Sequence, residues 1–199
     1  LAGGSADDTL NGGANDDILV GGGGNDTLDA GPGTDSVSGG SGNDVIIFGA
    51  SLTALDSVNG GSGTDQLGIS GNYAGGNALV LGAFTITDVE VLALLPGVGN
   101  SYSITSNDNN VAAGVEMTIF AGNLGAGQNF TFNGSGETDG FFRTFGGLGT
   151  DTITGGTQSD GFYFGPDKWQ AGDSVIGGLG GNDQLALDGR EGLAGPEIA

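Results

Sequence analysis

Aliphatic residues recur at every ninth position over the first fifty residues of the chain. They are Leu10, Leu19, Leu28, Val37 and Ile46, and each is the eighth residue of a unit that begins with turn residues. The last three positions of a unit can form only a very short strand, which buries one aliphatic side chain. Because one such strand cannot hold a fold alone, we expect the units to stack roughly 4.8 Å apart around an internal ladder of aliphatic residues.

Each unit also carries an aspartate at its sixth position, and these aspartates are Asp8, Asp17, Asp26, Asp35 and Asp44. Stacking brings their carboxylates together in a chain of formal net charge -21 with three basic residues, so the repulsion opposes folding. A hard divalent cation removes this conflict, and calcium prefers carboxylate and carbonyl oxygens. Magnesium needs a stricter geometry and is the weaker candidate, and zinc does not fit a chain without His or Cys.

Units such as GGGGNDTLD and GGSGNDVII resemble the nonapeptide repeat of the RTX calcium-binding proteins. The resemblance implies an all-β fold, a parallel β-roll or β-helix solenoid with calcium-binding turns, in which two nonapeptides make one coil. It also implies several calcium ions between turns two repeats apart: between Asp8 and Asp26, Asp26 and Asp44, and Asp17 and Asp35. Carbonyl groups of nearby glycines would supply most other ligands, namely Gly12, Gly13, Gly21, Gly22, Gly24, Gly31, Gly33, Gly39, Gly40 and Gly42.

Some units depart from the motif. Ala6 and Asn15 replace the fourth-place glycine, and because Asn tolerates a left-handed backbone better than Ala, the first turn is the weakest. Ala30 and Pro32 modify the fourth unit without touching its aspartate, Asp35. Composition alone, with 46 glycines in 199 residues, favours a disordered linker. The regular aliphatic positions argue against a linker in the presence of calcium, whereas without calcium we expect that description to be nearly right.

Beyond residue 47 the repeat slips and then returns. Three extra residues precede Asp56, and GGSGTDQLG restores the motif with Asp65 and with Gly60, Gly61 and Gly63 as further candidate ligands. A second block carries the candidate metal ligands Asp151, Asp160, Asp173, Asp183, Gly146, Gly147 and Gly149. Counting alternate turns pairs Asp35 with Asp56, Asp44 with Asp65, Asp151 with Asp173, and Asp160 with Asp183.

Between the two blocks the nonapeptide is absent, and short β-type runs alternate with clusters of Gly, Asn and Ser. We therefore expect a calcium-binding β-roll over residues 1–68, a calcium-free parallel β-helix over 69–145, a second calcium-binding block over 146–189, and a tail or the start of another coil over 190–199. The string FTFNGSGETDGFFRTFGGLGTD resembles segments of surface-layer-like and adhesin-like RTX chains of alphaproteobacteria.

The sequence offers little chemistry beyond metal binding. Without histidine the usual hydrolytic triads and metalloprotease motifs are absent, so we expect no enzyme and assign no catalytic or cofactor-binding residue. Glu90, Glu116 and Glu137 read as solvated side chains. The aromatic residues 162–164 with Lys168 and Trp169 suggest either a contact for a glycan or partner chain, or, in the preferred interpretation, an apolar plug.

Acidity argues against nucleic acid as a partner, and no apolar run is long enough to span a membrane. The chain starts within a repeat, so we expect a fragment of a longer protein. The RTX resemblance implies type I secretion, an extracellular or bacterial cell-surface location, and calcium-dependent folding and rigidification. Two other functions remain open: an accessory module of a secreted hydrolase, and a surface-layer or adhesin unit that self-assembles or contacts cell-surface polysaccharide.

Overall fold

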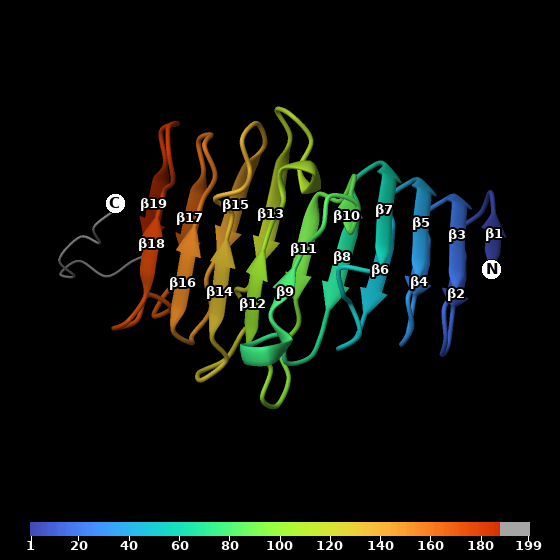
Figure 1. Cartoon of the computed structure of the whole chain (residues 1–199), viewed down its shortest axis with the longest axis horizontal. Helices are drawn as coiled ribbons and strands as arrows, with labels where there is room; N and C mark the ends of the chain where they lie inside the picture. The colour runs from blue at the N-terminus through green and yellow to red at the C-terminus, as the bar shows by residue number, and fades with distance from the viewer. Residues whose placement is uncertain (188–199) are drawn as a thin grey trace.

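The chain forms an elongated solenoid of parallel strands, in which successive coils lie side by side from the N-terminus to the C-terminal end (Figure 1). The structure is a computed structural model and describes residues 1–187. About nine coils follow from the nine strands of its largest sheet. Every strand pairing recorded within residues 1–187 is parallel, and this confirms the predicted all-β parallel solenoid.

The largest sheet runs the whole length of the described chain. Its strands, in spatial order from the N-terminal end, are β2 (Thr9–Asn11), β4 (Thr27–Asp29), β6 (Val45–Phe48), β8 (Gln66–Ile69), β11 (Val91–Leu94), β13 (Glu116–Phe120), β15 (Phe141–Phe145), β17 (Gly161–Phe164) and β19 (Gln184–Leu187). This sheet passes without a break through the three segments that the sequence distinguishes, and the division into segments stays a prediction.

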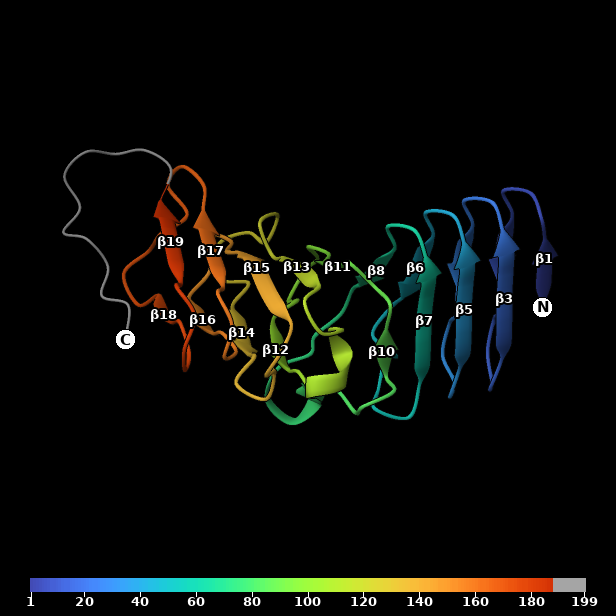
Figure 2. The same ribbon diagram turned by 90° about the horizontal axis from the view of Figure 1, so that it is seen from above.

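Two shorter sheets complete the coils on the opposite side (Figure 2). The N-terminal one contains β1 (Ala2–Gly4), β3 (Ile18–Gly23), β5 (Ser36–Ser41), β7 (Ser57–Ser62) and β10 (Ile86–Thr87). The C-terminal one contains β9 (Leu79–Val80), β12 (Tyr102–Thr105), β14 (Phe130–Asn133), β16 (Asp151–Thr154) and β18 (Ser174–Ile176). Two short 3₁₀ helices, η1 (Gly75–Asn77) and η2 (Asp108–Asn110), lie in loops of the middle coils.

The core is a ladder of one or two inward side chains per strand. The predicted aliphatic positions Leu19, Leu28 and Ile46 are fully buried in the first coils. Leu28 stacks between Leu10 and Ile46 in register, because each nonapeptide pair advances the chain by one coil. Toward the C-terminus the ladder widens to aromatic residues, of which Phe132 and Phe142 are both buried.

Candidate metal centres

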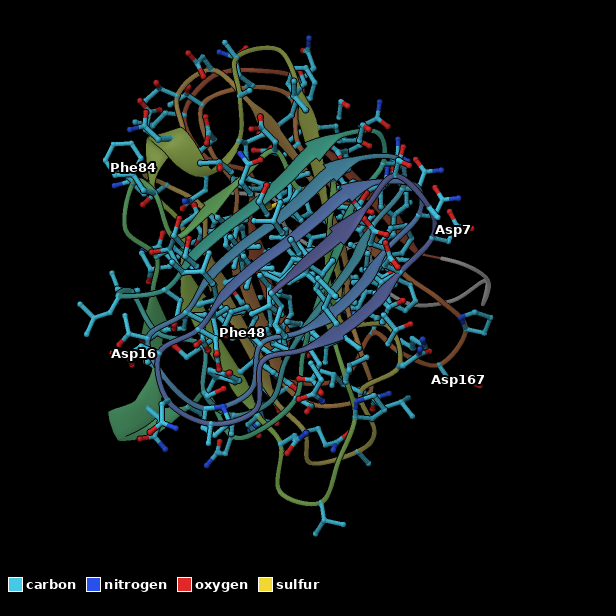
Figure 3. All side chains as sticks on the ribbon, turned by 90° about the vertical axis from the view of Figure 1, so that its right-hand side faces the viewer. Asp7, Asp16, Phe48, Phe84 and Asp167 are labelled. Carbon is cyan, nitrogen blue, oxygen red and sulfur yellow. The ribbon has the colours of Figure 1, made fainter. Side chains whose placement is uncertain are left out.

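Successive turns of the first nonapeptide block, residues 1–68, alternate between the two edges of the flattened coil. Viewed along the solenoid, Asp7 and Asp16 lie at opposite edges of the section, and Phe48 lies inside it (Figure 3). The alternation follows from the sequence, because each unit contains one turn and one short strand, and two units complete a coil. Aspartates eighteen residues apart are therefore neighbours on one edge.

Each predicted pair of aspartates lies on adjacent coils and shares one hydrogen bond. The backbone N–H of the earlier aspartate donates to Oδ1 of the later one. The N···O distances are 2.8 Å for Asp8–Asp26, 2.9 Å for Asp17–Asp35, 2.8 Å for Asp26–Asp44, 2.7 Å for Asp35–Asp56, 2.7 Å for Asp44–Asp65, 2.8 Å for Asp151–Asp173 and 2.9 Å for Asp160–Asp183. Counting alternate turns in the sequence thus predicts which turns meet, even across the insertions.

The other carboxylate oxygen of several aspartates has no protein donor. Oδ2 is buried without a hydrogen-bond partner in Asp17, Asp26, Asp35, Asp44 and Asp65. Asp26, Asp44 and Asp65 are at most 1 % exposed. A buried anionic oxygen without a partner is strongly unfavourable, so a column of them needs positive charge. Burial is also the main cause that raises the pKa of the Asp35 and Asp65 carboxyls.

The first-place glycine of most turns lets this oxygen and a carbonyl oxygen of the next coil approach its Cα closely, an arrangement that we call the cradle. At Gly21 a Cβ atom would lie 2.3 Å from Asp26 Oδ2 and 2.5 Å from the Gly39 carbonyl oxygen. At Gly39 it would lie 2.3 Å from Asp44 Oδ2 and 2.5 Å from the carbonyl oxygen of Gly60. A side chain at these positions would clash with both oxygens, and carboxylate and carbonyl oxygens held close together are the type of ligand that calcium prefers.

Similar cradles occur at the start and in the second block. The Cβ position of Gly3 is 2.6 Å from both Asp8 Oδ2 and the Gly21 carbonyl oxygen. At Gly155 the corresponding distances are 2.3 Å to Asp160 Oδ2 and 2.2 Å to the Gly177 carbonyl oxygen. Neither Gly3 nor Gly155 is among the glycines predicted as ligands, although both stand in the first place of a unit and could have been found by the period.

The predicted glycines serve the turns in different ways. Those in second place in the first block all have a positive φ angle that favours glycine, namely Gly13, Gly22, Gly31, Gly40 and Gly61, as do the fourth-place Gly24, Gly42 and Gly63. Asn15 has φ 82°, which confirms that it adopts the left-handed conformation in place of glycine. In the second block Gly146 is required for packing against a ring, because a Cβ there would lie 2.1 Å from the Phe164 ring.

The fourth unit differs from the others at its cradle. Ala30 stands where the other units have their first glycine, and it is fully buried. At the equivalent positions Gly21 and Gly39 a Cβ would lie 2.3 Å from the aspartate Oδ2, so the atoms around Ala30 must lie further apart to leave room for its methyl group. Asp35 nevertheless keeps the contacts of the other repeat aspartates, because its Oδ1 accepts the Asp17 N–H at 2.9 Å and its Oδ2 is buried without a partner.

Two predicted ligands are satisfied by the protein itself. Asp56 Oδ2 accepts hydrogen bonds from the Thr53 N–H at 2.7 Å and the Thr53 hydroxyl at 3.0 Å. Asp173 Oδ2 accepts one from the Gln170 N–H at 2.6 Å. Both aspartates follow an insertion in the sequence, and the inserted residues fold back to donate to the carboxylate. Local donors thus occupy the oxygen that is left without a partner in regular turns.

In the second block the buried carboxylates accept more hydrogen bonds from the protein itself. Asp151 is fully buried, and its Oδ2 accepts the Gly147 N–H at 2.8 Å while Oδ1 has no partner. Burial raises the pKa of Asp151 to about 7. Burial also raises the pKa of Asp160 to about 6, although its Oδ2 accepts the Gly156 N–H at 2.6 Å. A Cβ at Gly149 would lie 2.2 Å from the Gln128 carbonyl oxygen, so this turn packs against a coil without the motif.

Sequence reasoning missed two glutamates. Glu90 Oε2 accepts the Asp65 N–H at 2.6 Å, and Glu137 is fully buried with Oε2 unpartnered, so neither is a freely solvated side chain. Glu137 and the carboxylates of Asp108 and Asp139 offer oxygens within 4.8 Å of one another. No periodic signal marks these positions, because the coils that contain them have loops of unequal length.

The aromatic residues of the second block divide between the two faces of the sheet. Phe162 and Phe164 are buried, and Trp169 packs edge-on against Phe164 with ring centroids 4.8 Å apart, as expected of a plug. Tyr163 faces outward and stacks on Phe145 at 5.2 Å. The glycan or partner contact stays a prediction.

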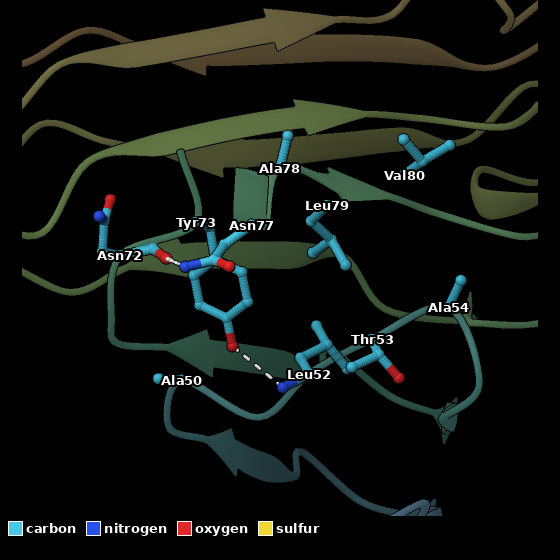
Figure 4. Close-up of a pocket in the computed structure, with 10 residues that line it drawn as sticks. All are labelled: Ala50, Leu52, Thr53, Ala54, Asn72, Tyr73, Asn77, Ala78, Leu79 and Val80. Atoms are coloured by element: carbon cyan, nitrogen blue, oxygen red, sulfur yellow. Dashed lines mark hydrogen bonds between the residues drawn. The ribbon is translucent and has the colours of Figure 1, made fainter. Parts of the chain in front are cut away.

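A groove of about 500 Å³ lies where the first block meets the middle segment, residues 69–145 (Figure 4). Leu52, Tyr73 and Leu79 line it. The Tyr73 hydroxyl donates to the Gly49 carbonyl and accepts the Leu52 N–H at 3.0 Å, and burial raises its pKa to about 12. The hydroxyl therefore uses its donor and an acceptor position in hydrogen bonds within the fold, and it has no acid–base role near neutral pH.

Comparison with known families agrees with the repeats. The family model of the RTX calcium-binding nonapeptide repeat matches residues 1–28, 20–50 and 145–166, in four copies. No curated protein matches the chain. No helix within residues 1–187 is long and apolar enough to cross a membrane. The matched segments coincide with stacked turns that carry the paired aspartates, and the chain therefore carries RTX calcium-binding nonapeptide repeats in two blocks of its solenoid.

Proposed function

We propose that this chain is a structural module that folds and becomes rigid when it binds extracellular calcium, as part of a larger secreted or cell-surface bacterial protein. The observation that carries the proposal is the column of buried aspartate oxygens without donors, all but that of Asp35 beside a glycine cradle. Without a cation these carboxylates repel one another, and their desolvation opposes folding. Several calcium ions offset both effects.

The proposed ions lie in the open cradles of the first block, beside Asp8, Asp17, Asp26 and Asp44. In the second block Asp160 stands in a similar cradle, but both its oxygens accept backbone N–H groups, from Phe142 and Gly156, so its role in this proposal is smaller. Asp56 and Asp173 have a smaller role in this proposal, because local N–H groups already bind their inner oxygens. Asp35 has the electrostatic need for an ion, but Ala30 fills the space. The remaining predicted glycines support these turns through their carbonyl groups and their backbone conformation.

In the cell, the same electrostatics would couple folding to location. Where calcium is scarce, the first block stays unfolded and suits passage through a narrow secretion channel. Outside, calcium at about 10⁻⁴ to 10⁻³ M, the range of weak extracellular sites, drives folding. The RTX repeat is a structural calcium-binding fold, and we assign the chain no catalytic role.

The direct test is a calcium titration of the chelated chain followed by far-UV circular dichroism, with magnesium as the matched control. We expect a cooperative gain of β-sheet signal with calcium, at a midpoint on the order of 10⁻⁴ to 10⁻³ M, and little response to the same concentration of magnesium. A β-sheet signal and thermal stability that are the same in calcium and in chelator would contradict the proposal.

A further inference from the structure

We propose one more calcium site, which lies between the turn of Asp65 and residues 88–90, beyond the last nonapeptide of the first block. Neither the family match nor the sequence motif reaches it, since residues 88–90 read Asp-Val-Glu with no glycine. The inference rests on the proposed calcium-dependent function and names a further site for it.

The backbone places residues 88–90 where the next nonapeptide turn would be. In a regular coil, the carbonyl oxygen of Asp26 accepts the N–H of Val45, the residue after Asp44, at 2.8 Å. In the same way, the Asp65 carbonyl oxygen accepts the N–H of Val91, the residue after Glu90, at 3.0 Å. Glu90 thus stands at the register position of the repeat aspartate.

The side chain of Glu90 also makes the contact that the repeat aspartates make. Its Oε2 accepts the Asp65 N–H at 2.6 Å, as Asp65 Oδ1 accepts the Asp44 N–H at 2.7 Å. The column of carboxylates on this edge therefore continues one coil past the motif. The longer side chain of glutamate reaches the N–H across a turn that has lost its glycines.

Next to this contact lies a cradle with an unpartnered carboxylate. Asp65 is fully buried, and its Oδ2 has no hydrogen-bond partner. The Cβ position of Gly60 lies 2.7 Å from this Oδ2 and 1.9 Å from the Asp88 carbonyl oxygen. Both oxygens thus approach Gly60 closely, as Asp44 Oδ2 and the Gly60 carbonyl oxygen approach Gly39, so the Asp88 carbonyl replaces the glycine carbonyl of a regular turn.

The negative charges around Asp65 favour binding of a divalent cation. The carboxylates of Asp44, Glu90 and Asp88 all repel the Asp65 carboxylate. Within residues 1–187 the two basic side chains are engaged elsewhere: Arg143 pairs with Glu116 at 3.0 Å, and the Lys168 ammonium donates to the Gly122 carbonyl. Because every candidate ligand is an oxygen, a hard divalent cation fits, and calcium suits the irregular set better than magnesium.

An ion here would join the two kinds of coil. Glu90 leads directly into β11, and its carbonyl oxygen accepts the Thr118 N–H of β13 at 2.8 Å. Asp65 closes the last turn of the first block. Calcium at this site would therefore couple the folding of the first block to the middle segment.

The test counts calcium ions bound at saturation, by equilibrium dialysis with metal analysis, in the whole chain and in Glu90→Gln. The amide can still accept the Asp65 N–H, but the charge is lost, so we expect one ion fewer, or one ion bound at least tenfold more weakly. The control is Glu116→Gln, which removes a partly exposed ion pair on the sheet face and should leave the count unchanged. An unchanged count and affinity in Glu90→Gln would overturn the inference.

Anomalous diffraction from crystals of the wild-type chain grown in calcium gives a second readout that does not depend on a variant's folding. We expect a peak within about 2.6 Å of both Asp65 Oδ2 and the Asp88 carbonyl oxygen. Peaks in the regular cradles without one here would overturn this inference and leave the proposed function standing. A wild-type chain that binds no calcium in either experiment would instead refute the proposed function.

Discussion

The first nonapeptide block and the middle segment build the same parallel coil, but they bury different groups. In the first block each coil buries small aliphatic residues such as Leu28 and Val37, together with nearly fully buried aspartates at its edges. In the middle segment the interior contains large rings, and Phe132 meets Phe142 edge-on at a centroid distance of 4.8 Å. Apolar burial thus favours folding much more in the middle coils than in the first block.

The edges of the two regions show the same contrast. In a middle-segment loop the amide of Asn110 donates to the carbonyl oxygens of Gly82 and Ile86, at 2.9 and 3.1 Å. Gln128 accepts the Gly125 N–H at 2.7 Å. Neutral amides satisfy the backbone groups of these turns, and within residues 69–145 Glu137 is the one buried glutamate with an unpartnered oxygen, whereas the first block presents a column of five such aspartates. The comparison indicates that one solenoid can combine coils held by apolar burial with coils held by metal binding.

Removal of calcium should separate the two regions most strongly. In chelator, we expect backbone amides of β2 to β7 to lose at least about a hundredfold of their hydrogen-exchange protection, because the carboxylate columns then oppose folding. Amides of β12 to β15 should keep most of theirs. Hydrogen exchange followed by mass spectrometry, with and without calcium, measures both in one sample. An equal loss along the whole chain would break the comparison.

Core truncations should give the second-largest difference in behaviour between the first block and the middle segment. Phe132→Ala removes a ring from the buried aromatic cluster, and we expect it to lower the free energy of unfolding by about 3–5 kcal/mol with or without calcium. Leu28→Ala should lower it by about 2–5 kcal/mol in calcium and have almost no effect in chelator, where its coil is already unfolded. Denaturant unfolding of both variants gives these values, and a calcium-independent effect of Leu28→Ala would contradict the comparison.

The pH should act on the calcium-free chain through Asp151. Its pKa is raised to about 7 in the folded chain from an ordinary value of 3.8, so the folded state holds more protons than the unfolded state between these values. Stability in chelator should therefore fall by a few kcal/mol as the pH rises from about 4 to 7, and then level off. Thermal unfolding across this range measures the fall, and in Asp151→Asn we expect a smaller fall that is complete by about pH 6, because the raised pKa of Asp160 still contributes.

The nine-residue period predicts the coil because every regular unit contains one turn and one strand of the same length. For that reason it places Leu28 inside and sets Asp26 beside Asp44. It fails where loops differ in length: Glu90 joins the Asp65 turn across 25 residues, a spacing that no repeat specifies. It also fails where the chemistry depends on a neighbour, as at Asp56, whose oxygen takes donors from the inserted Thr53.

The smallest expected effect concerns the one filled cradle of the first block. Ala30→Gly removes the methyl group beside Asp35, whose Oδ2 is buried without a partner, and so opens room for a cation. We expect the calcium midpoint to shift lower by less than about threefold, because glycine also destabilises the calcium-free coil by about 0.5–1 kcal/mol.

Gly39→Ala is the matched opposite of Ala30→Gly. Its new methyl group would lie 2.3 Å from Asp44 Oδ2, in a cradle that is open in the wild-type chain, and the calcium midpoint should rise. Calcium titrations of the two variants followed by circular dichroism compare them directly. Shifts in the same direction would show that the space beside the aspartate does not control calcium binding, and the first block would then differ from the middle segment by its charges alone.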